Sequence, residues 1–320
     1  MRRLAEAIVP DDALGADGLA EGIARYVELC RVQSPARDLE TIRLVGDLTA
    51  ERFGRDYAPQ IVRRDSYVVV SGREIPVRIF DPGGPSPRPG ICYFHGGGFS
   101  MGSVASFDIV CAALAQATGA VVVSGHYRRL PEAGYAAAQE DCDQVFAWTR
   151  RQSDALALDP ARIAVAGDSA GALLALAVAA NARDSGAELP ACQLLFYGTF
   201  AMDPERPAYA ASRDPLLTAD RVRGYVALFR SAGGLDRLPA PIDRVDLNGL
   251  PPTHIVAAEL DPLCSEAEEF AAKLGTAGVV VSVRRAPGMI HGFLRAVGVS
   301  TAARTELSHA ALAVHPFLRG

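Results

Sequence analysis

The chain has 320 residues, of which 49% are hydrophobic and 22% charged, and its net charge is −5 at pH 7. This composition is typical of a globular protein with a large core and excludes a disordered chain. No basic run indicates nucleic acid or a membrane surface as a partner, and no apolar stretch is long enough to span a bilayer.

The N-terminal segment and the cysteines indicate a cellular compartment. Two arginines are followed by only a few apolar residues and then by acidic ones, so we expect no secretory signal. The six cysteines are scattered, with no C-x-x-C pair. We therefore predict free, mostly buried thiols in a cytoplasmic protein, rather than disulfides or a metal site.

The expected elements begin with helices. Apolar residues recur at spacings of three and four within 19–30 and 39–53, so residues 1 to about 60 are predicted to be helical. Eight short apolar or β-branched runs then predict strands, at 66–70, 75–80, 90–94, 120–125, 162–167, 192–198, 253–259 and 279–286. The first two lie close enough to form a hairpin around 71–73. Helix-length segments separate most of the others, which predicts an α/β fold with a mostly parallel eight-stranded sheet, covered by helices on both faces.

One interval, about 199–250, breaks this alternation, because it contains an amphipathic helix and no good strand. We expect this insertion and the N-terminal helices to form a helical cap over the carboxyl edge of the sheet, where open α/β sheets bind ligands. The predicted division is therefore residues 1–60, contributing to the cap, and a catalytic domain at 61–320 that carries the insertion.

The candidate nucleophile is Ser169, within a G-x-S-x-G motif whose glycines are Gly167 and Gly171. The motif follows the strand at 162–167 and precedes an alanine- and leucine-rich helix, as a strained strand-to-helix turn requires. The pattern alone is weak evidence, because it recurs around Ser100. There the strand ends several residues before the first glycine, so we interpret Ser100 as a loop residue.

The segment His95–Gly96–Gly97–Gly98–Phe99 follows the strand at 90–94. Consecutive glycines can turn their amides toward one point, and an HGGG-type loop supplies oxyanion donors in lipases and esterases. We predict that the amides of Gly97, Gly98 and Ala170 form an oxyanion hole. Gly96 and Asp168 complete the two motifs, and His95 is interpreted as structural. The alternative is a flexible glycine-rich turn or a phosphate-binding loop, but the Gly-Lys-Ser/Thr ending of a P-loop is missing.

The acid and the base are expected after the late strands, in the order Ser, Asp or Glu, His. Asp261 follows the strand at 253–259, and His291 follows the last strand. Asp261 could also be a plain turn residue, because Asp-Pro is a common turn former, and Glu259 is the reserve candidate for the acid. His254 is predicted to lie in the core, whereas His126, His309 and His315 lie outside the loop after the last strand.

Together these motifs resemble the hormone-sensitive-lipase family of esterases, and more closely its bacterial acetyl esterase branch. The similar segments are HGGGF at 95–99, YRRLPE at 127–132, GDSAGA at 167–172, LFYG at 195–198, AELDPL at 258–263 and HGF at 291–293. The resemblance implies an α/β-hydrolase fold and hydrolysis of small, short-acyl esters by Ser169, His291 and Asp261 without a cofactor. It also implies an intracellular enzyme, and we expect a monomer or homodimer.

Two segments depart from the family pattern, Arg129 within YRRLPE and residues 134–138, which lack the usual Phe-Pro-x-Ala. Neither departure includes a residue of the predicted triad, so we expect both to affect local packing rather than catalysis. The same triad would also serve a lactonase, an amidase or a deacetylase, because the leaving group is chosen by the shape of the pocket. A ligand-binding protein that kept the fold and lost catalysis is the remaining alternative, although it would need a broken triad.

Overall fold

The computed structural model describes residues 15, 18–31, 38–54, 57–203, 205–235 and 240–319. Parts of the predicted helical region at 1–60 lie outside these ranges. Within them, no helix is both long and apolar enough to cross a membrane.

All eight predicted strands are present and form one sheet in the order β1-β2-β4-β3-β5-β6-β7-β8. β2 is antiparallel to both of its neighbours, β1 and β4, and the pairings along β4-β3-β5-β6-β7-β8 are all parallel. The strands are β1 (Val62–Val70), β2 (Arg73–Asp81), β3 (Arg88–Phe94), β4 (Val121–Gly125), β5 (Leu158–Asp168), β6 (Gln193–Phe196), β7 (Thr253–Ala258) and β8 (Val281–Ala286). The predicted hairpin is confirmed, because Val70 pairs with Arg73 across the turn.

Helices follow most of the strands, as the alternation predicts. They are α1 (Ile23–Cys30), α2 (Leu39–Ala50), α3 (Asp108–Thr118), α4 (Tyr135–Arg151), α5 (Ala170–Ser185), α6 (Pro207–Ala210), α7 (Ala219–Ser231), α8 (Cys264–Thr276) and α9 (Thr301–Leu318). Short 3-10 helices occur at η2 (Glu51–Phe53), η3 (Pro241–Asp243) and η4 (Phe293–Gly298).

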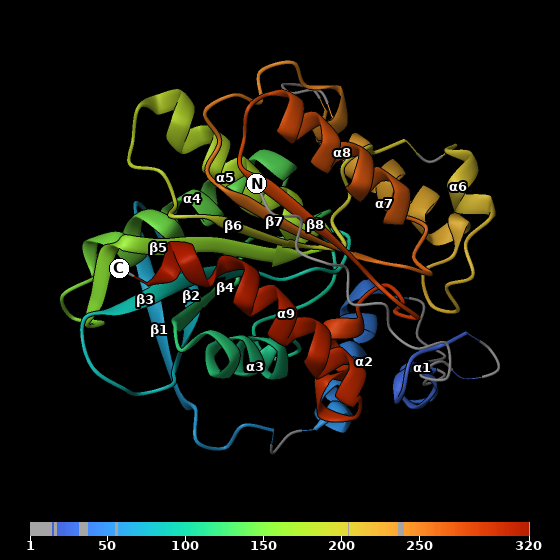
Figure 1. Cartoon of the computed structure of the whole chain (residues 1–320), viewed down its shortest axis with the longest axis horizontal. Helices are drawn as coiled ribbons and strands as arrows, with labels where there is room; N and C mark the ends of the chain where they lie inside the picture. The colour runs from blue at the N-terminus through green and yellow to red at the C-terminus, as the bar shows by residue number, and fades with distance from the viewer. Residues whose placement is uncertain are drawn as a thin grey trace.

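The centre of the sheet is buried on both faces, which explains why its central strands are almost wholly apolar. Successive residues of β3 belong to opposite cores: Cys92 and Phe94 pack with α4, α5 and α8, whereas Ile91 and Tyr93 pack with α3 and α9. Figure 1 shows these two helix layers on either side of the sheet.

The edge strand β1 begins four residues earlier than the apolar run at 66–70 predicts. Its first half is polar and is held by ion pairs rather than by burial. Arg63 bonds Asp108 at 2.7 Å, and Asp65 bonds Arg78 of β2 at 2.6 Å. Hydrophobic patterning does not detect such a segment.

The six cysteines are free, and five of them are buried, as predicted. Cys30 is the partly exposed member.

Helix α9 provides a test of the packing against α3. Leu307 is 2% exposed and Leu312 is 67% exposed on the same helix. We expect Leu307→Ala to lower the free energy of unfolding by about 2–5 kcal/mol, because it leaves a cavity in the core. Leu312→Ala makes the same chemical change at the surface and should cost less than about 0.5 kcal/mol. Urea denaturation measures both, and equal losses would contradict this account of α9.

Candidate functional site

Ser169 occupies the turn between β5 and α5, with φ 53° and ψ −120°. Residues other than glycine rarely adopt this backbone conformation. The positions that flank Ser169 at 167 and 171 have room only for glycine, because the neighbouring backbone lies too close for a side chain. A Cβ on Gly171 would lie 1.9 Å from the carbonyl oxygen of Phe94, and one on Gly167 would lie 2.3 Å from the carbonyl oxygen of Gly171. The motif therefore allows α5 to approach the ends of β3 and β5.

The structure brings together the three residues that the sequence singles out at the strand ends. His291 Nε2 lies 2.8 Å from Ser169 Oγ, and His291 Nδ1 lies 2.6 Å from Asp261 Oδ2. Asp261 follows β7 and is 4% exposed, and His291 lies in the loop between β8 and η4. The hydroxyl, imidazole and carboxylate are arranged as in the catalytic triad of serine hydrolases.

The glycine loop lies beside Ser169. Gly97 and Gly98 have φ values of 117° and 58°, and a Cβ on Gly98 would lie 2.1 Å from the ring of Tyr225 in α7. Within the described chain, the amides of Gly97, Gly98 and Ala170 donate to no acceptor. Ala170 is also the first residue of α5, where helix amides have no intrahelical partner.

Asp168 connects the glycine loop to the turn that carries Ser169. Its Oδ1 accepts hydrogen bonds from the Tyr93 hydroxyl at 2.6 Å and from the Gly96 amide at 2.8 Å. Burial raises the pKa of this carboxyl to about 6, although both hydrogen bonds favour its charged form. Asp168 is therefore ionised above that pH, where its hydrogen bonds to the loop are strongest.

His95 is buried, stacked on the ring of Tyr127 at 4.4 Å, and its Nδ1 lies 2.9 Å from the carbonyl oxygen of Gly96. Burial lowers the pKa of His95 to about 3, so the ring is neutral at pH 7. His95 forms no hydrogen bond with Ser169 and packs beneath the loop. His254 is buried in β7, and Ser100 lies in the loop after the glycines, as expected.

The reserve acid, Glu259, is occupied elsewhere, because its Oε2 accepts a hydrogen bond from the amide of Gly288 at 2.7 Å. A second carboxylate that the sequence did not reveal is Asp214, in the 199–250 insertion. Its Oδ2 accepts from the His291 amide at 2.5 Å, and its Oδ1 accepts from the amides of Leu216 and Leu217. Asp214 thus connects the insertion to the His291 loop.

The electrostatic surroundings of His291 favour its protonated form. Burial alone would lower its pKa, but the nearby carboxylate of Asp261, with smaller contributions from Asp214 and Asp168, raises it above the usual value. Burial, and then the charge of Asp261, raises the pKa of Asp214 in turn. An imidazole in this environment accepts a proton readily.

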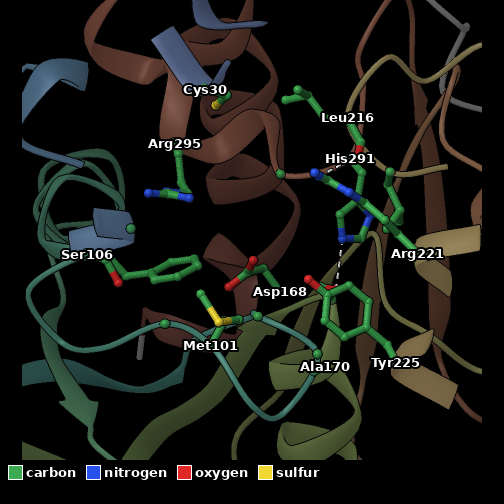
Figure 2. Close-up of a pocket in the computed structure, with 18 of the residues that line it drawn as sticks. Cys30, Met101, Ser106, Asp168, Ala170, Leu216, Arg221, Tyr225, His291 and Arg295 are labelled. Carbon is green, nitrogen blue, oxygen red and sulfur yellow. Dashed lines mark hydrogen bonds between the residues drawn. The ribbon is translucent and has the colours of Figure 1, made fainter. Parts of the chain in front are cut away.

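A cavity of about 820 Å³ opens onto Ser169 and His291. Its walls come from the glycine loop and from α1, α2 and α7, through residues such as Tyr26, Arg43 and Tyr225. Figure 2 shows Tyr225 and His291 near each other, with Arg295 and Cys30 further along the cavity. Among the described residues, no group of three or more His, Cys, Asp or Glu side chains could hold a metal ion.

Comparisons with known proteins agree with this geometry. Residues 91–295 match a protein family described by its alpha/beta hydrolase fold. The chain belongs to the α/β-hydrolase family. Its carboxylesterase relative NlhH of Mycobacterium tuberculosis is 38% identical over 232 residues, which cover 69% of this chain and 72% of that protein. The ethyl acetate hydrolase of Pseudomonas putida is 30% identical over 290 residues, covering 85% and 91% of the two chains.

Solved α/β-hydrolase structures are also similar over nearly the whole chain. The hyperthermophilic esterase of the archaeon Pyrobaculum calidifontis is 32% identical with a TM-score of 0.84, covering 93% of this chain and 98% of that one. The metagenomic carboxylesterase EstE1 is 31% identical with a TM-score of 0.82, covering 90% and 100%. The predicted resemblance and fold are confirmed, and this α/β-hydrolase is an enzyme of the esterase class.

The carboxylate of Asp214 provides a test of the electrostatics around His291. Asp214→Asn removes a negative charge that favours the imidazolium, so we expect the pKa of His291 to fall. Imidazole resonances followed by NMR across a pH titration measure this change. Asp203→Asn is the control, because Asp203 is exposed in the same insertion. An unchanged His291 pKa in Asp214→Asn would show that Asp214 does not act on the imidazole.

Proposed function

We propose that the protein is a serine carboxylesterase in which Ser169 is the nucleophile, His291 the general base and Asp261 the residue that orients the imidazole. The observation that carries the proposal is the continuous hydrogen-bonded series from Ser169 Oγ through His291 to Asp261, with distances of 2.8 and 2.6 Å. A broken series would have favoured a binding protein without catalysis.

In this mechanism His291 takes the proton of Ser169 as Oγ attacks the ester carbonyl. The amides of Gly97, Gly98 and Ala170, which donate to no acceptor within the described chain, donate to the developing oxyanion. His291 then gives the proton to the leaving alcohol. Water, activated by the same imidazole, hydrolyses the acyl-enzyme and regenerates Ser169.

Small, short-acyl esters are the proposed substrates. The cavity of about 820 Å³ lies within the usual range for small-molecule sites, and Met101, Leu216 and Tyr225 are among its lining residues. Two relatives carry matching names: the ethyl acetate hydrolase already described and an acetyl esterase of Salmonella paratyphi B, which is 29% identical over 279 residues.

We also propose that α1, α2, α6 and α7 form a cap over the site, contributed by residues 1–60 and by the insertion at about 199–250. Residues of α1, α2 and α7 line the cavity, and Figure 1 shows α1 and α7 beyond the end of the sheet toward which the β5 arrow points.

The free cysteines support a cytoplasmic location for the protein. A monomer or homodimer remains our prediction for the assembly.

The nucleophile is tested by Ser169→Ala. We expect kcat to fall by about 10⁶-fold, as when a serine nucleophile is removed from a triad, and covalent labelling by a fluorophosphonate to disappear. Ser100→Ala is the matched control, since Ser100 lies in the other G-x-S-x-G segment, and it should still be labelled. Full turnover or labelling of Ser169→Ala would refute the assignment.

The acyl preference is tested with p-nitrophenyl esters from acetate to dodecanoate, together with lactones and anilides. We expect kcat/KM to be highest for the short acyl chains and to decline towards dodecanoate, because a long alkyl chain would lie against charged side chains of the cavity wall such as Arg43 and Arg295. A maximum at dodecanoate would contradict the short-acyl proposal. Faster turnover of a lactone or anilide than of any ester would assign the triad to one of the alternative reactions.

A further inference from the structure

Arg295 lies in the wall of the cavity, in η4 and four residues after His291. Figure 2 shows its guanidinium on the opposite side of the cavity from His291, with Asp168 between them in this view. The proposed mechanism gives Arg295 no role, although a cation in a substrate cavity affects which molecules bind there.

Among the described residues, the guanidinium of Arg295 has no hydrogen-bonding partner. No hydrogen bond or ion pair joins it to any residue that the structure describes, and its Nε is buried without a partner. The group lies instead over the rings of Phe53 and Phe107, with its central carbon 4.7 and 5.4 Å from their centroids. Buried donors that remain unsatisfied are costly, and a guanidinium is shaped to bind a carboxylate with two hydrogen bonds.

The other charged residues of the cavity wall are already satisfied. Arg43 binds both oxygens of Glu132 at 2.7 and 2.9 Å, and Arg221 donates to the carbonyl of Leu216 at 2.9 Å. Arg31 is exposed to water.

The two acidic residues of the wall, Asp47 and Asp168, are also engaged. Asp47 accepts from the Ser103 hydroxyl at 2.8 Å, and Asp168 is bound to Tyr93 and Gly96. Within the described residues neither carboxylate forms an ion pair with Arg295, whose charge acts on Asp168 only as a minor influence beside burial and hydrogen bonding.

The cavity is therefore basic within an acidic protein. Its described lining includes four arginines and two aspartates, whereas the whole chain has a net charge of −5. Such a cavity attracts anions, because low-dielectric walls concentrate the field of the charges that line it.

We propose that Arg295 binds a free carboxylate of the substrate, so that the preferred substrates are esters carrying a second, ionised carboxyl group. This inference rests on the proposed esterase function. The carboxylate either belongs to the acyl part, as in a half-ester of a dicarboxylic acid, or to the alcohol part, as in an acylated hydroxy acid. In both cases water cleaves the ester bond to an acid and an alcohol, and the second carboxylate is unchanged.

Two matched pairs of esters test the proposal at pH 8, with hydrolysis followed by acid release. Monomethyl adipate is compared with methyl hexanoate for a carboxylate on the acyl side, and 4-acetoxybutanoate with butyl acetate for one on the alcohol side. In at least one pair, wild-type enzyme should have the higher kcat/KM for the charged ester. Arg295→Met should lower the ratio of charged to neutral kcat/KM by about tenfold or more, since hydrogen bonds to charged groups are strong.

Two further variants distinguish the planar, two-donor geometry of the Arg295 guanidinium from its positive charge and from the net charge of the protein. Arg295→Lys keeps the charge without the planar fork and should give an intermediate ratio. Arg151→Met, on the exposed side of α4 and outside the cavity, changes the net charge equally and should keep the wild-type ratio. Preference for the neutral ester in both pairs, or an unchanged ratio in Arg295→Met, would overturn the proposal.

A measurement on wild-type enzyme alone covers the case in which Arg295→Met does not fold. Adipate should inhibit hydrolysis of butyl acetate more strongly than 1,6-hexanediol does, and added salt should weaken that inhibition. Equal inhibition by the two compounds would contradict a carboxylate site. Failure to cleave even the neutral esters would instead count against the proposed esterase function.

Discussion

The site depends on a contact between backbones. At Gly171, the first turn of α5 meets the end of β3 so closely that a single added carbon would lie 1.9 Å from the carbonyl oxygen of Phe94. This contact places the turn that carries Ser169 directly beside the loop that begins at His95. The proposed nucleophile and the proposed oxyanion donors therefore become neighbours because of how a helix packs on a sheet, independently of any contact between their side chains.

Hydrogen bonds then hold the neighbouring parts in register. The buried carboxylate of Asp168 joins the nucleophile turn to the Gly96 amide and to Tyr93 of β3. On the other side, Asp214 holds the amide of His291. Each connection uses a carboxylate to satisfy backbone amides that would otherwise be unpaired, and charge-assisted bonds of this type are among the stronger ones in proteins.

Much of this arrangement could be predicted from the sequence. The eight strands, the hairpin and the positions of Ser169, Asp261 and His291 follow from apolar runs and from the residues that end them, because parallel strands bring their carboxyl ends to one edge. The polar half of β1 was missed, because ion pairs rather than burial hold it. Asp214 was missed because it precedes a proline in a segment without strands, where an aspartate has the pattern of an ordinary turn residue. The unpaired state of Arg295 is also invisible in the sequence, since it depends on the absence of neighbours in space.

The ring of Tyr225 lies against Gly98, so that one residue of α7 forms a wall of the glycine loop. The insertion at about 199–250, which carries α7, is a module that contributes to selectivity through the shape of the pocket. In this chain the insertion is not independent of the glycine loop. An insertion of different length, taken from another protein, would leave Gly98 without the contact that Tyr225 now makes. Transplanted insertions would then change turnover as well as selectivity, unless the aromatic ring is transferred in register with the recipient loop.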